Sequence, residues 1–352
     1  MSLASNDSVN AAGDKQVSVE SFVVDQDVAY NWDYDTDRAK LMRLYENAKR
    51  DQWNSTERID WDQDVDPHSE LLPDMAIGIF GTPMWERLTD AEVKKLRHEF
   101  VTWQLAQFLH GEQGALLATA QLVDSVPWYE AKQYGATQVM DEARHVEVYR
   151  RFLQDKLEHD YPINPELKKL LDLILTDTRW DMKFLGMQIM VEGLALAAFG
   201  TIRDTTQNKL LRDLTSAVIE DETRHVAFGV LSLREHYQGL SEADRRERED
   251  FVYEAAVLMR DRILNREVWD RMGMDADACI DASMDSAIAK EYRHRLFSKI
   301  VPNVGSLGLL SDRQRARFED LGILQHEHNT TSDVDHDAEI EARVRAGELE
   351  LN

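Results

Sequence analysis

The chain has 352 residues, of which 43% are hydrophobic and 8% are aromatic, a globular composition that can bury a substantial core. Its formal net charge of −25 excludes the basic face that non-specific binding to nucleic acid or anionic lipid requires. Cys279 is the only cysteine, which excludes an intrachain disulfide. Because no signal peptide or membrane span is readable, we expect a cytoplasmic protein without nucleic acid or membrane as a partner.

The first part of the chain is expected to contribute little to the core. Residues 1–26 are rich in serine, asparagine and aspartate and lack an apolar period, which predicts a mobile arm. Residues 27–88 are expected to hold one amphipathic helix between Asp35 and Trp61, followed by a long loop rich in proline and glycine.

Residues 89–238 are expected to form a bundle of four long helices. Thr89 and Glu92 have the spacing of a capping box, and Pro127 and Pro165 stand where the first turns of later helices are expected. A break is expected near Asp177. The predicted helices cover about 89–123, 127–159, 165–205 and 208–237.

The last part of the chain continues the helical pattern. Further helices are expected over residues 239–325, packed on the bundle, and residues 326–352 are expected to be an acidic tail. No stretch alternates between apolar and polar residues with a period of two, so the predicted fold class is all-α, with additional N- and C-terminal helices around the bundle.

A short motif occurs twice, at residues 141–146 and 221–226, and reads aspartate, glutamate, a variable residue, arginine, histidine and valine. A further glutamate precedes the glutamate of each copy by 30 residues. The chain thus repeats one set of three candidate metal ligands at a constant offset of 80 residues. The six candidates are Glu112, Glu142, His145, Glu192, Glu222 and His225.

The spacing within the repeat suits two helical hairpins. Glu142 and His145 are three residues apart, so their side chains leave one face of a helix. Glu112 lies about twelve residues before the expected turn and Glu142 about fifteen after it, and each leg is roughly 20 Å long. An antiparallel hairpin therefore brings Glu112 level with Glu142 and His145, and the second copy behaves in the same way.

Four carboxylates and two imidazoles at one level suit two divalent iron ions, or manganese in their place. Buried carboxylates are costly unless cations hold them, and the residues around Glu112 and Glu192 are apolar. The alternative, a structural repeat with solvated side chains, explains one copy more easily than two. We expect Asp141 and Asp221 to accept the free ring N–H of the histidines. Arg144 and Arg224 are expected to fix these carboxylates, unless the pairs are surface salt bridges.

A glutamate and a Glu-x-x-His motif, given twice on four long helices, resemble the ferritin-like carboxylate-bridged di-iron superfamily. The resemblance covers about residues 90–238. It implies one iron on the first three candidate ligands and one on the last three, with Glu142 and Glu222 as bridges and O2 as co-substrate.

The superfamily includes enzymes that hydroxylate, epoxidise or N-oxygenate, and also iron-storage proteins, peroxidases and generators of a tyrosyl radical. Plain ferritins lack the second copy in this form, and rubrerythrin-type peroxidases usually add a cysteine-rich module. Many bacterial multicomponent hydroxylases have a threonine where this chain has Leu196. Ribonucleotide reductase small subunits usually have aspartate at the position of Glu112, but their radical tyrosine matches Tyr149. The alternative for Tyr149 is an ordinary core aromatic residue.

The resemblance and the length favour an O2-activating oxygenase of a small apolar or aromatic substrate, such as the smaller epoxidases and arylamine oxygenases. A radical-generating reductase subunit and a ferroxidase or iron-storage protein stay open. No dinucleotide fingerprint is visible, so electrons are expected from a separate reductase or ferredoxin. We also expect a homodimer. Residues one or two turns from the ligands are expected to line the substrate cavity: Phe108, Ala115, Leu116, Thr119, Gln188, Leu196, Phe199 and Gly229.

Overall fold

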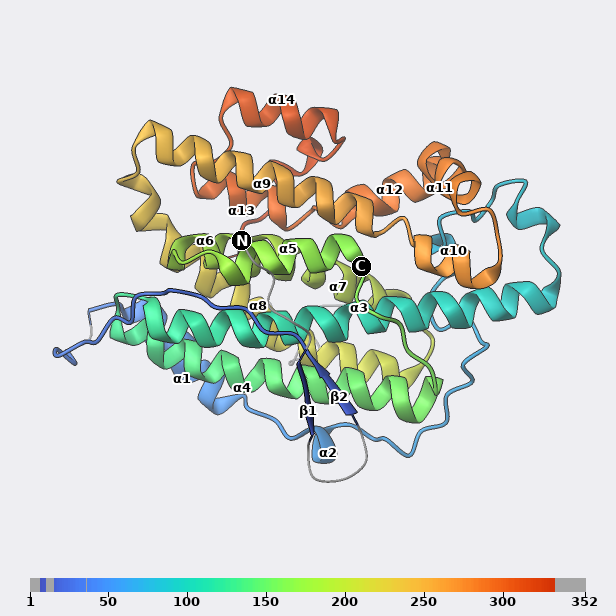
Figure 1. The fold of residues 1–352 in the computed structure, drawn as a ribbon, viewed down its shortest axis with the longest axis horizontal. Coiled ribbons are helices and arrows are strands. Elements are labelled where there is room, and N and C mark those ends of the chain that lie inside the picture. The colour runs from blue at the N-terminus through green and yellow to red at the C-terminus, as the bar shows by residue number, and fades with distance from the viewer. Residues whose placement is uncertain (1–6, 11–15, 36, 333–352) are drawn as a thin grey trace, which may run out of the picture.

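The computed structural model describes residues 7–10, 16–35 and 37–332. Helices make up the body of the molecule (Figure 1), so the prediction of an all-α protein is confirmed. The described strands are β1 (Asp7–Asn10) and β2 (Gln16–Val19), a short antiparallel ribbon within the predicted arm. Residues 1–6 and 11–15 of that arm and most of the predicted tail lie outside the described residues.

The bundle consists of two antiparallel hairpins. The first pairs α3 (Asp90–Ser125) with α4 (Tyr129–Phe152). In the second, α8 (Lys209–Gln238) pairs with a helix in three parts: α6 (Trp180–Phe184), the π-helical segment η4 (Leu185–Val191) and α7 (Glu192–Thr205). The two hairpins meet where α4 packs on α8 and α3 packs on α6 and η4.

Local sequence signals fix the ends of these helices. Thr89 Oγ1 accepts a hydrogen bond from the Glu92 N–H at 3.3 Å, and Glu92 Oε2 accepts one from the Thr89 N–H at 2.8 Å, which forms the expected capping box. Asn208 caps α8 through the Leu211 N–H. The break expected near Asp177 within residues 165–205 is present at that extended residue, and α5 (Pro165–Thr176), which precedes it, packs on α9.

Two segments have wider π-helical turns, which the sequence pattern did not indicate. One is η3 (Leu153–Leu157) at the end of α4, and the other is η4, which ends immediately before Glu192. A π-helical turn shifts the register of the side chains that follow it, and such turns occur frequently at functional sites. Here η4 sets which face of the helix Glu192 occupies.

The N-terminal helix is shorter than predicted. Instead of one helix from Asp35 to Trp61, the structure has α1 (Ala39–Arg50) and α2 (Ser55–Arg58). The chain breaks between them because Asn54 caps α2 and accepts a hydrogen bond from the Thr56 N–H at 2.9 Å. Helix α1 packs on α4 and α8, and the break leaves Trp53 free to enter the bundle.

The remaining helices lie mainly after the bundle in the chain and cover its other side (Figure 1). They are α9 (Glu242–Arg262), α10 (Arg266–Met272), α11 (Ala276–Asp285), α12 (Ala287–Arg295), α13 (Ile300–Ser306) and α14 (Asp312–Asp320). Three short 3-10 turns are η1 (Asp74–Ala76), η2 (Trp85–Arg87) and η5 (Leu324–His326).

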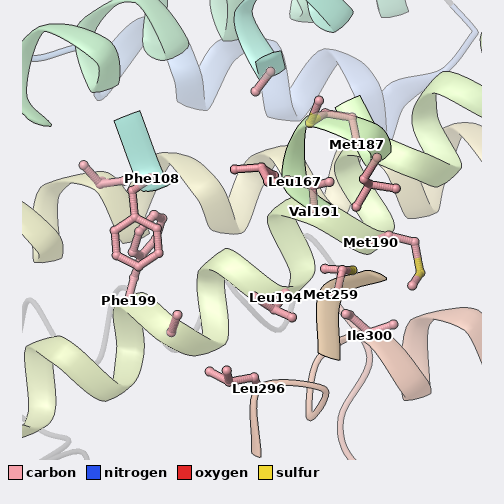
Figure 2. Close-up of a cluster of buried hydrophobic side chains, with 14 of the residues drawn as sticks. Phe108, Leu167, Met187, Met190, Val191, Leu194, Phe199, Met259, Leu296 and Ile300 are labelled. Carbon is pink, nitrogen blue, oxygen red and sulfur yellow. The ribbon is translucent and has the colours of Figure 1, made fainter. Parts of the chain in front are cut away.

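The second hairpin forms the centre of the core. Figure 2 shows apolar side chains of η4 and α7 packed against Leu167 of α5, Met259 of α9 and Ile300 of α13. By length and composition alone, the stretch Trp180–Thr205 could cross a membrane, although no membrane span was readable in the sequence. In the most apolar part of this stretch, 83% is buried inside the protein, so the stretch is a core helix.

Candidate metal centre

The six candidate ligands converge in the middle of the bundle and are all buried. Helix α3 provides one of them, α4 and α8 provide two each, and the last is the first residue of α7. Their side-chain atoms form two groups whose members lie within 4.8 Å of one another. The first group is Glu112, Glu142, His145 and Glu222, and the second is Glu142, Glu192 and His225.

In the first group, the carboxylates surround one ring nitrogen. Nδ1 of His145 lies 3.4 Å from Glu112 Oε2, 3.4 Å from Glu142 Oε2 and 3.1 Å from Glu222 Oε1. Oxygen and imidazole nitrogen atoms at this spacing form a donor set that suits iron or manganese.

Carboxylates also lie around one ring nitrogen of His225, and one of them is Glu222 of the first group. Its Nδ1 lies 3.1 Å from Glu142 Oε1 and 3.6 Å from Glu222 Oε2. Glu142 and Glu222 therefore each direct one oxygen toward His145 and the other toward His225. This is the arrangement that a carboxylate bridging two ions requires.

Six of the candidate ligand atoms lack hydrogen-bond partners within the described part of the protein. Nδ1 of both histidines, Oε2 of Glu142 and Glu192, and both oxygens of Glu222 are buried without one. Buried polar atoms are costly when unpaired, and several in one place indicate an ion. The donor set and its unpaired atoms therefore fit a pair of divalent cations.

The electrostatics of the cluster also favour cations. Burial and the charge of Glu222 raise the pKa of Glu112 and of Glu192 well above the ordinary value for a carboxyl group. Burial opposes protonation of His145, yet the nearby carboxylates of Asp221 and Glu112 raise its pKa well above the ordinary value. The protein thus retains protons here when no metal ion is bound, and divalent ions would displace them.

A second layer of charged residues orients the histidines, and it crosses between the hairpins. Nε2 of His145 on α4 lies 3.1 Å from Asp221 Oδ2 on α8, and Nε2 of His225 on α8 lies 3.4 Å from Asp141 Oδ2 on α4. Each histidine thus directs Nδ1 toward the glutamates and Nε2 toward an aspartate of the other hairpin. Such a partner fixes the ring and its tautomer.

Two arginines join this layer, and both are buried. Arg144 Nη2 donates to Asp141 Oδ1 at 2.5 Å and to Asp221 Oδ2 at 2.9 Å. Arg224 donates to Asp221 Oδ1. These pairs lie inside the protein rather than at its surface, and Arg144 connects the aspartates of both hairpins.

Three contacting residues were missed in the sequence. Gln138 Nε2 donates to Glu142 Oε1 and to Glu192 Oε1, each at 3.0 Å. Its position one turn before Glu142 on the same helical face was a usable signal. Gln52 and Trp53 donate to the aspartates of the second layer from the loop between α1 and α2. Nothing in the sequence pattern places that loop against the bundle.

Two tyrosines lie beside the cluster with buried hydroxyl groups that have no hydrogen-bond partner among the described residues, Tyr149 and Tyr134. The ring of Tyr149 packs against Phe108 and Phe199 at centroid distances of 5.7 and 5.9 Å. Burial and the charge of Glu112 raise its pKa well above the ordinary value, so Tyr149 stays protonated.

The residues predicted to line a substrate cavity lie close to the ligands, in a tightly packed region. Phe108 and Phe199 are in edge contact at 4.6 Å between ring centroids, near the left of Figure 2. Gln188 Nε2 lies 3.5 Å from both Thr119 Oγ1 and Glu192 Oε1. A Cβ atom on Gly229 would lie 2.6 Å from Gln188 Cβ. Ala115 and Leu196 are also buried and Leu116 is half-buried, and the cavity stays a prediction.

The family described as p-aminobenzoate N-oxygenase AurF matches residues 35–308, most of the chain and all of the bundle. The chain belongs to this family. It is a family of di-iron N-oxygenases within the ferritin-like superfamily, so the predicted superfamily is confirmed. The protein is an oxidoreductase with a two-metal centre, and the buried cluster of glutamates and histidines can hold the metal ions.

Solved structures similar to the chain include two of an R2-like ligand-binding oxidase. One is the oxidase with an aerobically reconstituted metal cofactor after photoconversion, which is 17% identical to this chain with a TM-score of 0.49. The match covers 76% of this chain and 92% of the chain in that structure. The other is a mutant of the oxidase with an anaerobically reconstituted Mn/Fe cofactor, which is 19% identical with a TM-score of 0.46. The match covers 77% of this chain and 93% of the chain in that structure. No curated protein matches the chain.

Proposed function

We propose that the protein is an O2-dependent N-oxygenase that acts on the amino group of a small aromatic amine. The family provides the reaction type, since its description names p-aminobenzoate N-oxygenation. The observation that carries the proposal is the pair of histidines whose Nδ1 atoms face Glu142 and Glu222 without hydrogen-bond partners in the described part of the chain.

In this proposal Glu112 and His145 hold one ion and Glu192 and His225 hold the other. Glu142 and Glu222 would be shared by both ions, since each directs one oxygen toward His145 and the other toward His225. Divalent ions held at this site would supply the activation of O2, which protein side chains alone do not provide. Iron is the metal expected in this family, and manganese suits the same donor set.

The surrounding residues orient these ligands and keep bulk water out. Asp221 and Asp141 hold the two imidazole rings with Nδ1 directed inward. Gln138 holds Glu142 and Glu192 together from one side. Phe108, Phe199 and Tyr149 form an aromatic wall next to Glu112, which suits a flat aromatic substrate.

The direct test is oxygen transfer to an arylamine. The protein is loaded with ferrous iron without oxygen, then mixed with 18O2, p-aminobenzoate and a chemical reductant, and products are followed by mass spectrometry. We expect an N-oxygenated product that carries 18O and is absent with Glu142→Gln. Iron that is bound and oxidised without 18O in any arylamine product, over a panel of aromatic amines, would contradict the proposal.

The alternative with a specific observation in its favour is radical generation at Tyr149. Its hydroxyl has no hydrogen-bond partner among the described residues, and the ring lies near Glu112. A stable tyrosyl signal in paramagnetic resonance after O2 exposure, lost with Tyr149→Phe, would support that alternative. Under the N-oxygenase proposal, Tyr149→Phe retains product formation.

A further inference from the structure

A row of aromatic side chains is exposed along one side of the molecule. The segment before α1 runs in extended conformation over the first hairpin, as the blue chain of Figure 1 shows. Tyr30, Trp32 and Tyr34 on this segment are 69%, 83% and 57% exposed. Soluble proteins rarely leave large aromatic residues in a contiguous exposed row unless a partner covers them.

The exposure follows from how the segment is fixed to the bundle. The Ala29 N–H donates to the Asp124 carbonyl at 2.8 Å, and Asn31 Nδ2 donates to the Pro127 carbonyl at 2.8 Å. Ala29 and Asn31 are half-buried, whereas Tyr30 and Trp32 are exposed, as expected where alternate residues of an extended chain point to opposite sides.

The charges beside the row define what kind of partner fits it. Five exposed aspartates, none in an ion pair with a described residue, flank or interrupt the aromatic side chains: Asp25, Asp27, Asp33, Asp35 and Asp37. A second copy of this chain would bring the same carboxylates against them and be repelled. The complementary partner therefore has a basic rim around an apolar contact.

A groove of 540 Å³ continues the row between α1 and α4. Tyr34 contacts Tyr129, a residue of the groove wall, edge-on at 5.0 Å between ring centroids. Met140 in the groove is 59% exposed. The two lysines of the groove already have partners, since Lys49 pairs with Glu46 and Lys132 donates to two backbone carbonyls.

Side-chain contacts link the groove to the buried cluster. Gln52 lines it and donates through Nε2 to Asp141 Oδ1 at 2.7 Å. Asp141 Oδ2 in turn lies 3.4 Å from Nε2 of His225, whose Nδ1 faces Glu142. Gln52 and Asp141 therefore connect the surface groove with the candidate ligand His225.

We propose that the aromatic row and this groove form the docking surface for an electron-donating protein with a basic rim. The inference rests on the proposed function. Transfer of one oxygen atom of O2 to the amine leaves the other as water and consumes two electrons and two protons. The donor, a flavoprotein or iron–sulfur protein, becomes oxidised as it supplies both electrons at this surface, and solvent supplies the protons.

The test compares a protein donor with a small one. The oxidised, iron-loaded protein is mixed without oxygen either with a ferredoxin reductase flavoprotein that has a basic face, reduced by NADPH, or with reduced methyl viologen. The main variant carries Tyr30→Ser, Trp32→Ser and Tyr34→Ser together. Met75→Ser, which changes a residue 51% exposed elsewhere on the surface, is the control.

We expect saturable reduction of the wild type by the flavoprotein, at least tenfold slower in the triple variant and unchanged in the control. All forms should react equally with methyl viologen. The rate with the flavoprotein should fall as salt is added, and Asp33→Asn with Asp35→Asn should weaken that dependence, since both remove charge from the surface.

Several outcomes would overturn the docking surface. One is an equal rate of reduction by the flavoprotein in all variants, and another is a rate that does not saturate in the wild type. A third is that light scattering finds a dimer for the wild type and a monomer for the triple variant. The last result would assign the row to a second copy. Failure of methyl viologen to reduce the wild type would instead overturn the proposed function, and the docking proposal with it.

Discussion

Asp221 lies 3.1 Å from His145 although the two residues belong to different hairpins of the bundle. Asp141 and His225 repeat this relationship in the opposite direction at 3.4 Å. Each half of the centre is therefore oriented by the other half. The two copies of the motif form one interlocked unit rather than two independent half-sites.

Asp221→Asn should weaken metal binding by about 10- to 100-fold, because the neutral amide no longer stabilises the ring of His145 in its ligand orientation. Asp213→Asn, on the same helix but in a surface pair with Lys209, should leave binding unchanged. Titration with ferrous or manganous ion under anaerobic conditions measures both. Equal affinities for the two variants would show that the crossed contact has no role in holding metal.

Two buried arginines should respond oppositely to the same substitution. Burial lowers the pKa of Arg262 to about 10, and its Nε has no hydrogen-bond partner in the described chain. Arg248 instead donates to buried Asp181 from Nε and Nη2, both at 3.0 Å. Arg262→Met should raise the free energy of unfolding by about 1–3 kcal/mol, whereas Arg248→Met should lower it by about 3 kcal/mol.

Denaturant unfolding of both arginine variants at pH 7 measures these changes. A loss of stability in Arg262→Met as large as that in Arg248→Met would show that Arg262 has a counter-ion in solution.

Lys183 should make stability depend on pH in the alkaline range. Its Nζ donates to Gln121 Oε1 at 2.6 Å and to two carbonyls at the end of α5, and burial lowers its pKa from 10.5 to about 8. Between these values the unfolded chain binds the extra proton, so this residue's contribution makes stability rise with pH. Below about pH 8 both states are protonated and the contribution is constant.

Unfolding of the wild type and Lys183→Met at pH 7, 8, 9 and 10 isolates that contribution as a difference. Above pH 8 the free energy of unfolding of the wild type should rise relative to that of the variant by at most about 1.4 kcal/mol per pH unit. A difference that is independent of pH would contradict the lowered pKa.

The sequence was sufficient for the helical bundle and for bringing the candidate ligands together, because the repeat combines helical periodicity with a constant hairpin length. Glu112 could be placed level with His145 from the rise per residue alone. The sequence did not specify that each aspartate contacts the histidine of the other hairpin. Spacing along a helix indicates which face a residue occupies but not which neighbouring helix it contacts.

Other features depend on irregular or distant structure. The π-helical segment η4 leaves no periodic signal, although it sets the orientation of Glu192. Gln52 and Trp53 reach the aspartates only because the predicted N-terminal helix ends at Arg50. Such contacts are decided by tertiary packing, which local propensity does not determine.

The central claim is that the six ligands hold two ions that share Glu142. The most direct measurement is the number of ferrous ions bound per chain under anaerobic conditions, for the wild type, Glu192→Gln and Glu142→Gln. The account predicts about two ions for the wild type, about one for Glu192→Gln, and loss of both for Glu142→Gln, which belongs to both groups. A wild type that binds one ion or none, or a Glu142→Gln variant that still binds two, would contradict it.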